Sequence, residues 1–240
     1  MGMILEGICL VPGQDEFIPD SNTYVVGNPA SKDLSLIDPG LTGKGRYKIE
    51  ALQAMGIELS FLRRIILTHA HIGHIGCLSE IRQQIPTAEL WIHAREAEPL
   101  ERGDERIVYG NMARSLCQAQ YGLRPGAFHV RVDRKLRGGE TFDLGGMPWE
   151  IIHIPGHSLG SIALYQRSRR MLISGDVVYA NDTVGRSDFH GGDAHELKKS
   201  LMRLAQLEVD VLLPGHNRIA EGLPSGYIVK IIQEWKRGVG

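Results

Sequence analysis

Three histidines lie within six residues of one another in the run Thr68-His69-Ala70-His71-Ile72-Gly73-His74, directly after an apolar stretch at residues 65–67. Side chains at positions i and i+2 of an extended strand end point to the same side, so His69 and His71 can close on one cation. His74 follows three residues later and points from the start of the next helix. The run therefore predicts a metal site with room for two neighbouring cations.

This run resembles the signature His-x-His-x-Asp-His of the metallo-β-lactamase superfamily. The resemblance implies three further ligands in the order of the chain, His157, Asp176 and His216. Each of them follows an apolar run that we predict to be a buried strand. Loops at strand ends are positions from which a rigid sheet can aim side chains into one cleft. We interpret the other five histidines as ordinary surface or core residues: His93, His129, His153, His190 and His195.

The same resemblance implies that His69, His71 and His157 hold a first cation, that His74 and His216 hold a second, and that Asp176 lies between the two. Gly73 stands at the position of the signature aspartate and offers no ligating atom. Two outcomes stay open. The centre holds one cation, on the first three histidines and Asp176, or its second site is completed by another carboxylate, such as Asp182 or Asp188.

The implied ligands are imidazoles and carboxylates without a thiolate, which suits zinc, iron or manganese. We expect one or two divalent metal ions as cofactors and favour zinc. Such a cation lowers the pKa of bound water towards 7 and polarises a carbonyl, so that hydroxide is present for hydrolysis at neutral pH. Asp176 and His74 are then the catalytic residues. Loss of the signature aspartate would weaken positioning and proton removal, a contribution of about 10²- to 10⁴-fold.

A second resemblance covers residues 175–180 and 185–193, which look like the corresponding segment of hydroxyacylglutathione hydrolases (glyoxalase II) and their short bacterial relatives. Persulfide dioxygenases share a similar Gly-Arg-x-Asp stretch. The candidates for substrate binding in this segment are Tyr179, Arg186, Asp188 and His190, of which His190 stands where proline is expected. We expect Arg186 and Asp188 to pair and brace the loop, with contact to an anionic substrate as the alternative.

Composition limits the class of protein. A chain of 240 residues with 42% hydrophobic residues is long enough for one sizeable core, so we predict a single domain over residues 1–240. A formal charge of −1 without a long basic run argues against a nucleic-acid partner. The odd set of three cysteines and the lack of a signal or bilayer-length span predict a cytoplasmic protein without a membrane partner. We expect a small-molecule substrate, and a homodimer is the one assembly that we consider.

Apolar runs predict strands at residues 4–11, 23–26, 34–37, 65–67, 89–92, 149–154, 162–165, 171–173 and 209–213. Helical periodicity appears at residues 49–55, 75–85, 197–207 and 228–235. This order is typical of an α/β protein with two mixed β-sheets packed face to face and helices outside, the αββα sandwich that the resemblance also implies. Residues 95–124 look like a helical insertion over the active-site mouth, and a plain pair of surface helices is the alternative.

Three functions remain open. We favour a metal-dependent hydrolase of a thioester, lactone or related ester, because the ligand set and the loop after Asp176 both point there. The first alternative is a mononuclear iron enzyme resembling persulfide dioxygenase, in which His69, His157 and Asp176 form a two-histidine, one-carboxylate triad. That chemistry needs one metal and depends least on residue 73. The second alternative is a degenerate metal-binding protein in which Gly73 marks lost catalysis.

Overall fold

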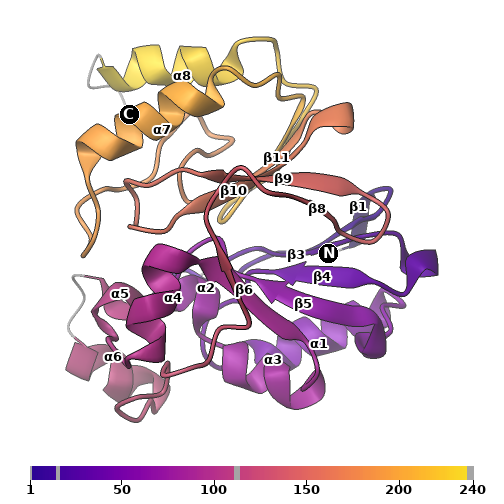
Figure 1. Ribbon diagram of the computed structural model, residues 1–240, viewed down its shortest axis with the longest axis vertical. Coiled ribbons are helices and arrows are strands. Elements are labelled where there is room, and N and C mark those ends of the chain that lie inside the picture. Colours follow the sequence, from indigo (N-terminus) through magenta and orange to yellow (C-terminus); the bar gives the residue numbers. More distant parts are fainter. Residues whose placement is uncertain (1, 15–16, 111–113, 237–240) are drawn as a thin grey trace.

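The protein is described by a computed structural model that covers residues 2–14, 17–110 and 114–236. Its strands form two sheets that pack face to face, with helices against both outer faces (Figure 1). The first part of the chain forms one sheet and its helices, and the later part forms the other sheet with α7 and α8. The predicted αββα sandwich is confirmed.

The first sheet is mixed and contains, among the described residues, seven strands in sequence order. These are β1 (Gly2–Leu5), β2 (Ile8–Val11), β3 (Thr23–Val26), β4 (Leu34–Ile37), β5 (Leu62–Ile66), β6 (Glu89–His93) and β7 (Arg134–Leu136). The strands from β1 to β4 pair antiparallel, and those from β4 to β7 pair parallel. The carboxyl ends of β4 and β5 therefore lie at the same edge.

The second sheet has six strands in the described part of the chain, in the order β13, β12, β11, β10, β9, β8. Their bounds are β8 (Thr141–Asp143), β9 (Pro148–His153), β10 (Ile162–Gln166), β11 (Met171–Gly175), β12 (Val211–Pro214) and β13 (Ala220–Glu221). Only β11 and β12 pair parallel there among these strands. Their shared direction brings the loops that carry Asp176 and His216 to one place.

Successive side chains of a strand point to opposite faces of the sheet, and this alternation divides the core into layers. In β2, Ile8 and Leu10 face the second sheet, whereas Cys9 and Val11 face the helices on the outside. Trp149 and Ile151 of β9 meet the first sheet from the opposite side. A strand buried on both faces reads as a continuous apolar run, which is why these segments are easy to find in the sequence.

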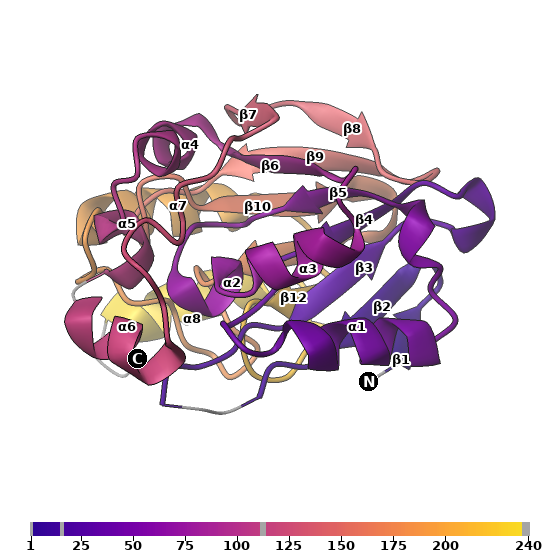
Figure 2. The same ribbon diagram turned by 90° about the horizontal axis from the view of Figure 1, so that it is seen from below.

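Two helix pairs cover the outer faces, as the view from below also shows for the first sheet (Figure 2). The first sheet is covered by α1 (Gly45–Ala54) and α3 (Leu78–Gln84), and the second by α7 (Ala194–Leu204) and α8 (Tyr227–Lys236). The α7 helix begins after Asp193, whose carboxylate accepts hydrogen bonds from the first backbone N–H groups. No helix within the described ranges has the length and hydrophobicity needed to cross a bilayer.

The structure corrects two of the predicted elements. The single strand at residues 4–11 is a hairpin, because the chain turns back at Gly7, whose φ of +73° favours glycine. The single helix at residues 75–85 is split into α2 (Ile72–Ile75) and α3. The break lies at Gly76, where a Cβ atom would stand only 2.4 Å from the backbone nitrogen of Thr42.

The predicted insertion is helical and lies between β6 and β7. It consists of α4 (Ala94–Glu101), α5 (Arg106–Tyr109) and α6 (Arg114–Tyr121), which gather at one end of the sandwich (Figures 1 and 2). Residues 111–113 of the insertion lie outside the described residues.

Candidate metal centre

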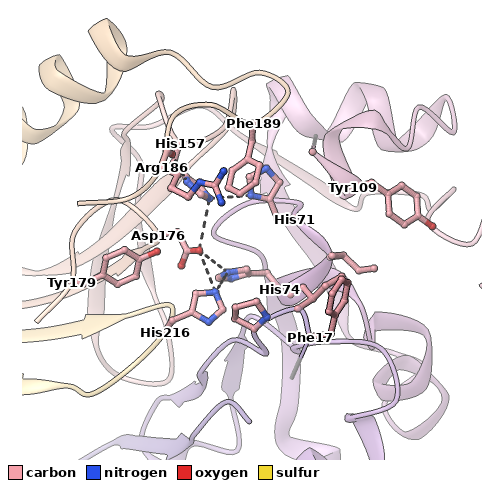
Figure 3. Close-up of a pocket in the computed structure, with 15 residues that line it drawn as sticks. Phe17, His71, His74, Tyr109, His157, Asp176, Tyr179, Arg186, Phe189 and His216 are labelled. Atoms are coloured by element: carbon pink, nitrogen blue, oxygen red, sulfur yellow. Dashed lines mark hydrogen bonds and ion pairs between the residues drawn. The ribbon is translucent and has the colours of Figure 1, made fainter. Parts of the chain in front are cut away.

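The loops at the carboxyl ends of four strands meet at one point. The loop after β5 and the short α2 helix carry three of the site residues, and the loops after β9, β11 and β12 carry one each. The structure brings together all six side chains that the resemblance implies as ligands: His69, His71, His74, His157, Asp176 and His216. Figure 3 shows Asp176 between the imidazoles of His74, His157 and His216.

The first group of donors is His69, His71 and His157, whose ligating atoms lie within 4.8 Å of one another. Nδ1 of His71 lies 2.9 Å from Nε2 of His157. The other nitrogen of the His157 ring, Nδ1, lies 2.7 Å from the main-chain oxygen of Arg186, which fixes the ring orientation. Burial lowers the pKa of His69 and of His71 well below the usual value, and neighbouring imidazoles lower it further. These rings are therefore neutral and have lone pairs to offer a cation.

The second group is His74, His216 and Asp176. Oδ2 of Asp176 lies 3.3 Å from Nε2 of His74 and 3.2 Å from Nε2 of His216, and the two ring nitrogens are 3.2 Å apart. Burial alone would lower the pKa of His74, but the carboxylates of Asp176 and Asp38 raise it to about 10. Burial alone would raise the pKa of Asp176, but His216 and His74 hold it well below its usual value. Asp176 is therefore a carboxylate shared by the group.

The residues present fit a divalent cation. Nε2 of His69 and Oδ1 of Asp176 are buried and have no hydrogen-bond partner among the described residues. Leaving such atoms unpaired costs about 1–3 kcal/mol each, and coordination would remove that cost. The donors are nitrogen and oxygen atoms, which suit zinc, iron or manganese.

Asp38 is part of the site although the sequence analysis did not select it. Its carboxylate accepts hydrogen bonds from the backbone N–H and the hydroxyl of Thr68, both at 2.7 Å, and lies 2.9 Å from Nδ1 of His74. Its φ is +54°, a strained conformation for a non-glycine residue, which the surrounding hydrogen bonds maintain. Asp38 directly follows β4, as Asp176 directly follows β11, so its place at a strand end is the signal that could have found it.

Asp38→Asn should lower the affinity for the second cation by about 10- to 100-fold, because a partner that orients a ligating histidine is lost. Asparagine tolerates the same backbone conformation, so the fold should persist. Competition with a chromophoric chelator measures the affinity. Asp33→Asn is the matched control, because Asp33 lies at the other end of β4 and pairs with Arg64, away from the site. Equal affinity in Asp38→Asn and the control would contradict the prediction.

The two carboxylates considered as substitutes for the signature aspartate are engaged elsewhere. Asp182 pairs with Lys230 at 2.9 Å, and Asp188 forms a two-point pair with Arg186 at 2.6 and 2.9 Å. The Arg186 pair has the geometry expected of a loop brace. Neither carboxylate lies in the donor groups formed by the described residues.

All the donor residues except His69 line a cavity of about 330 Å³. Its other walls are largely apolar and come from Phe17, Ile18, Ile72, Tyr109 and Phe189. Phe189 lies against the rings of both His71 and His157 (Figure 3). Tyr109 and the following Gly110 bring the insertion to the cavity wall.

The substrate-binding candidates divide into two pairs. Tyr179 and Arg186 line the cavity, whereas Asp188 and His190 are not among its lining residues. Burial and the nearby Asp176 carboxylate raise the pKa of Tyr179 well above its usual value, so its hydroxyl stays protonated. Among the remaining histidines, the rings of His93 and His153 stack on each other at 3.8 Å, and neither belongs to a donor group.

An αββα sandwich with a histidine and carboxylate cluster at its strand ends defines a class of metal-binding protein. The chain belongs to the metallo-β-lactamase superfamily, whose family model matches residues 19–216. The resemblance stated from the sequence is thereby confirmed.

Individual relatives agree with this assignment. The chain is 29% identical over 189 residues to the hydroxyacylglutathione hydrolase GloC of Haemophilus influenzae, covering 77% of this chain and 80% of that protein. It is 32% identical over 160 residues to the acyl-coenzyme A thioesterase MBLAC2 of Gallus gallus, covering 63% of this chain and 55% of that protein. The solved structure of TTHA1623 in a di-iron-bound form has a TM-score of 0.66 at 26% identity, covering 88% of this chain and 94% of that one.

Proposed function

We propose that this protein is a metal-dependent hydrolase of thioesters, with lactones and related activated esters as the nearest alternative substrates. The observation that carries the proposal is the convergence of four histidines and Asp176 on a cavity with apolar walls, with His69 buried beside them. Two relatives whose names specify thioester substrates, a hydroxyacylglutathione and an acyl-coenzyme A, support this substrate class. Zinc is the cation that we favour.

A bound divalent cation supplies Lewis acidity, which activates water and polarises the substrate carbonyl. The chain supplies the rest. Asp176 is positioned to accept a proton from the attacking water, because its Oδ1 is buried and unpaired among the described side chains. Tyr179 keeps its proton and can donate a hydrogen bond next to that carboxylate. The apolar side chains of Phe17, Tyr109 and Phe189 exclude water and accept the acyl group.

The proposal predicts that the zinc-loaded protein releases free thiol from an acyl-glutathione or acyl-coenzyme A, that a chelator abolishes the release, and that zinc restores it. A colorimetric thiol assay follows the reaction, and a homoserine lactone and a simple aryl ester complete the panel. Protein loaded with iron or manganese is assayed in parallel. Oxygen consumption with a persulfide by the iron form, without thioester hydrolysis by any form, would instead assign the dioxygenase function.

A further inference from the structure

The loop between β2 and β3 brings its backbone next to residue 73, the position of the signature aspartate. A Cβ atom at Gly73 would stand 2.5 Å from the main-chain oxygen of Pro19 and 3.7 Å from the carbon of that carbonyl. The oxygen is nearer by about the length of a C=O bond, so the carbonyl points at residue 73. A carboxylate oxygen of an aspartate lies about 2.4 Å from its own Cβ. The Pro19 oxygen is therefore at the distance that an aspartate oxygen would have.

Pro19 also lies beside the second donor group. Pro19 lines the same cavity as His74 and His216, and the Cβ position of residue 73 is 3.8 Å from Cε1 of His216. No N–H or O–H of the described residues donates a hydrogen bond to the Pro19 oxygen. Within the described part of the chain, this oxygen is therefore engaged by no donor and is available as a ligand.

The loop that carries this carbonyl is fixed on both sides. The backbone N–H of Ser21 donates to the main-chain oxygen of Gly73 at 3.0 Å, and Nδ1–H of His216 donates to the main-chain oxygen of Asp20 at 3.0 Å. The Asp20 carboxylate accepts from the backbone N–H of Leu41 at 2.8 Å and pairs with buried Lys48 at 3.1 Å. The loop therefore orients His216 and holds the Pro19 carbonyl in the same arrangement.

We propose that the main-chain oxygen of Pro19 replaces the missing carboxylate as the oxygen ligand of a second cation, beside His74, His216 and Asp176. This inference rests on the proposed metal-dependent function. A carbonyl oxygen is a hard donor of the kind that divalent cations accept, but it carries no charge. The second cation is therefore bound more weakly than the first, yet the site persists without an acidic residue at position 73.

Two substitutions at Gly73 distinguish coordination by the Pro19 carbonyl from coordination by a carboxylate at residue 73. Gly73→Ala adds a methyl group that must displace the Pro19 oxygen and brings no ligand, whereas Gly73→Asp displaces the same oxygen and supplies a carboxylate. In a cobalt(II) titration of metal-depleted full-length protein, Gly73→Ala should bind the first equivalent normally and the second about 10- to 100-fold more weakly. Gly73→Asp should recover the second equivalent. Pro19→Ala is the matched control, because it keeps the main-chain carbonyl and should bind both.

A spectroscopic measurement on the natural chain does not depend on the folding of a variant. The chain has 11 prolines, and labelling their carbonyl carbons with ¹³C allows the Pro19 signal to be assigned as the one lost in Pro19→Ala. This signal should shift when the second equivalent of zinc is added and not when the first is added. An unshifted signal, or a Gly73→Ala variant that binds the second equivalent as tightly as the natural chain, would overturn the inference. Failure to bind even a first equivalent would overturn the proposed function instead.

Discussion

Asp176→Asn should lower kcat/KM for thioester hydrolysis by about 10²- to 10⁴-fold, the range for loss of a group that moves a proton in the transition state. Oδ2 of Asp176 lies between 3.2 and 3.7 Å from Nε2 of His74, His157 and His216, so one carboxylate serves both donor groups. An amide of the same shape cannot accept the proton. It also removes the anionic ligand that both cations would share.

The matched control is Asp182→Asn. Asp182 follows Asp176 by six residues and pairs with exposed Lys230, outside the cavity. The control should keep both the metal content and the rate of the natural chain, whereas Asp176→Asn should also lose bound metal. Initial rates with one thioester, together with metal analysis of the same samples, test both expectations. A fall in rate of less than about tenfold in Asp176→Asn would remove this residue from the chemistry.

The sequence was sufficient to predict most of the fold because the central strands are apolar on both faces. Strands such as β2 and β10 stand out as apolar runs. The edge strands β7, β8 and β13 were missed, because they are short and contain exposed polar residues. A strand of two or three residues forms because it pairs with a neighbouring strand, and it is too short to show a pattern of its own in the sequence.

The donor side chains, like the central strands, could be predicted from the sequence. The residues that support them could not. His69 and His71 carry their chemistry in their side chains and in their spacing. Pro19 acts through a main-chain carbonyl that any residue type would provide, so no sequence pattern marks it. Lys48 lies on a helix in a charged stretch and has the appearance of a surface residue, although its side chain is fully buried. Burial of this kind depends on tertiary packing.

Lys48→Met should destabilise the protein by about 3–5 kcal/mol, the usual result of removing one partner from a buried ion pair. Nζ of Lys48 lies 3.1 Å from Oδ2 of Asp20 and donates to the main-chain oxygen of Ser21 at 2.7 Å. Both side chains of the pair are 0% exposed, so the Asp20 carboxylate would be left charged without a counter-ion or water. Methionine fills a similar volume, so the effect reports the lost charge and not a cavity. Thermal unfolding should show a decrease in Tm of about 6–20 °C.

Lys199→Met is the control for loss of a lysine charge on a helix. Lys199 pairs with Glu196 on the exposed face of α7, and removing such a pair should change stability by less than about 1 kcal/mol. The double variant Lys48→Met with Asp20→Asn should recover much of the lost stability, because it removes the unpaired carboxylate as well. The same loop presents the Pro19 and Asp20 carbonyls to the site, so Lys48→Met should also weaken the second cation while the first stays bound. Equal weakening of both cations would show that Lys48 supports the whole sandwich and not this loop in particular.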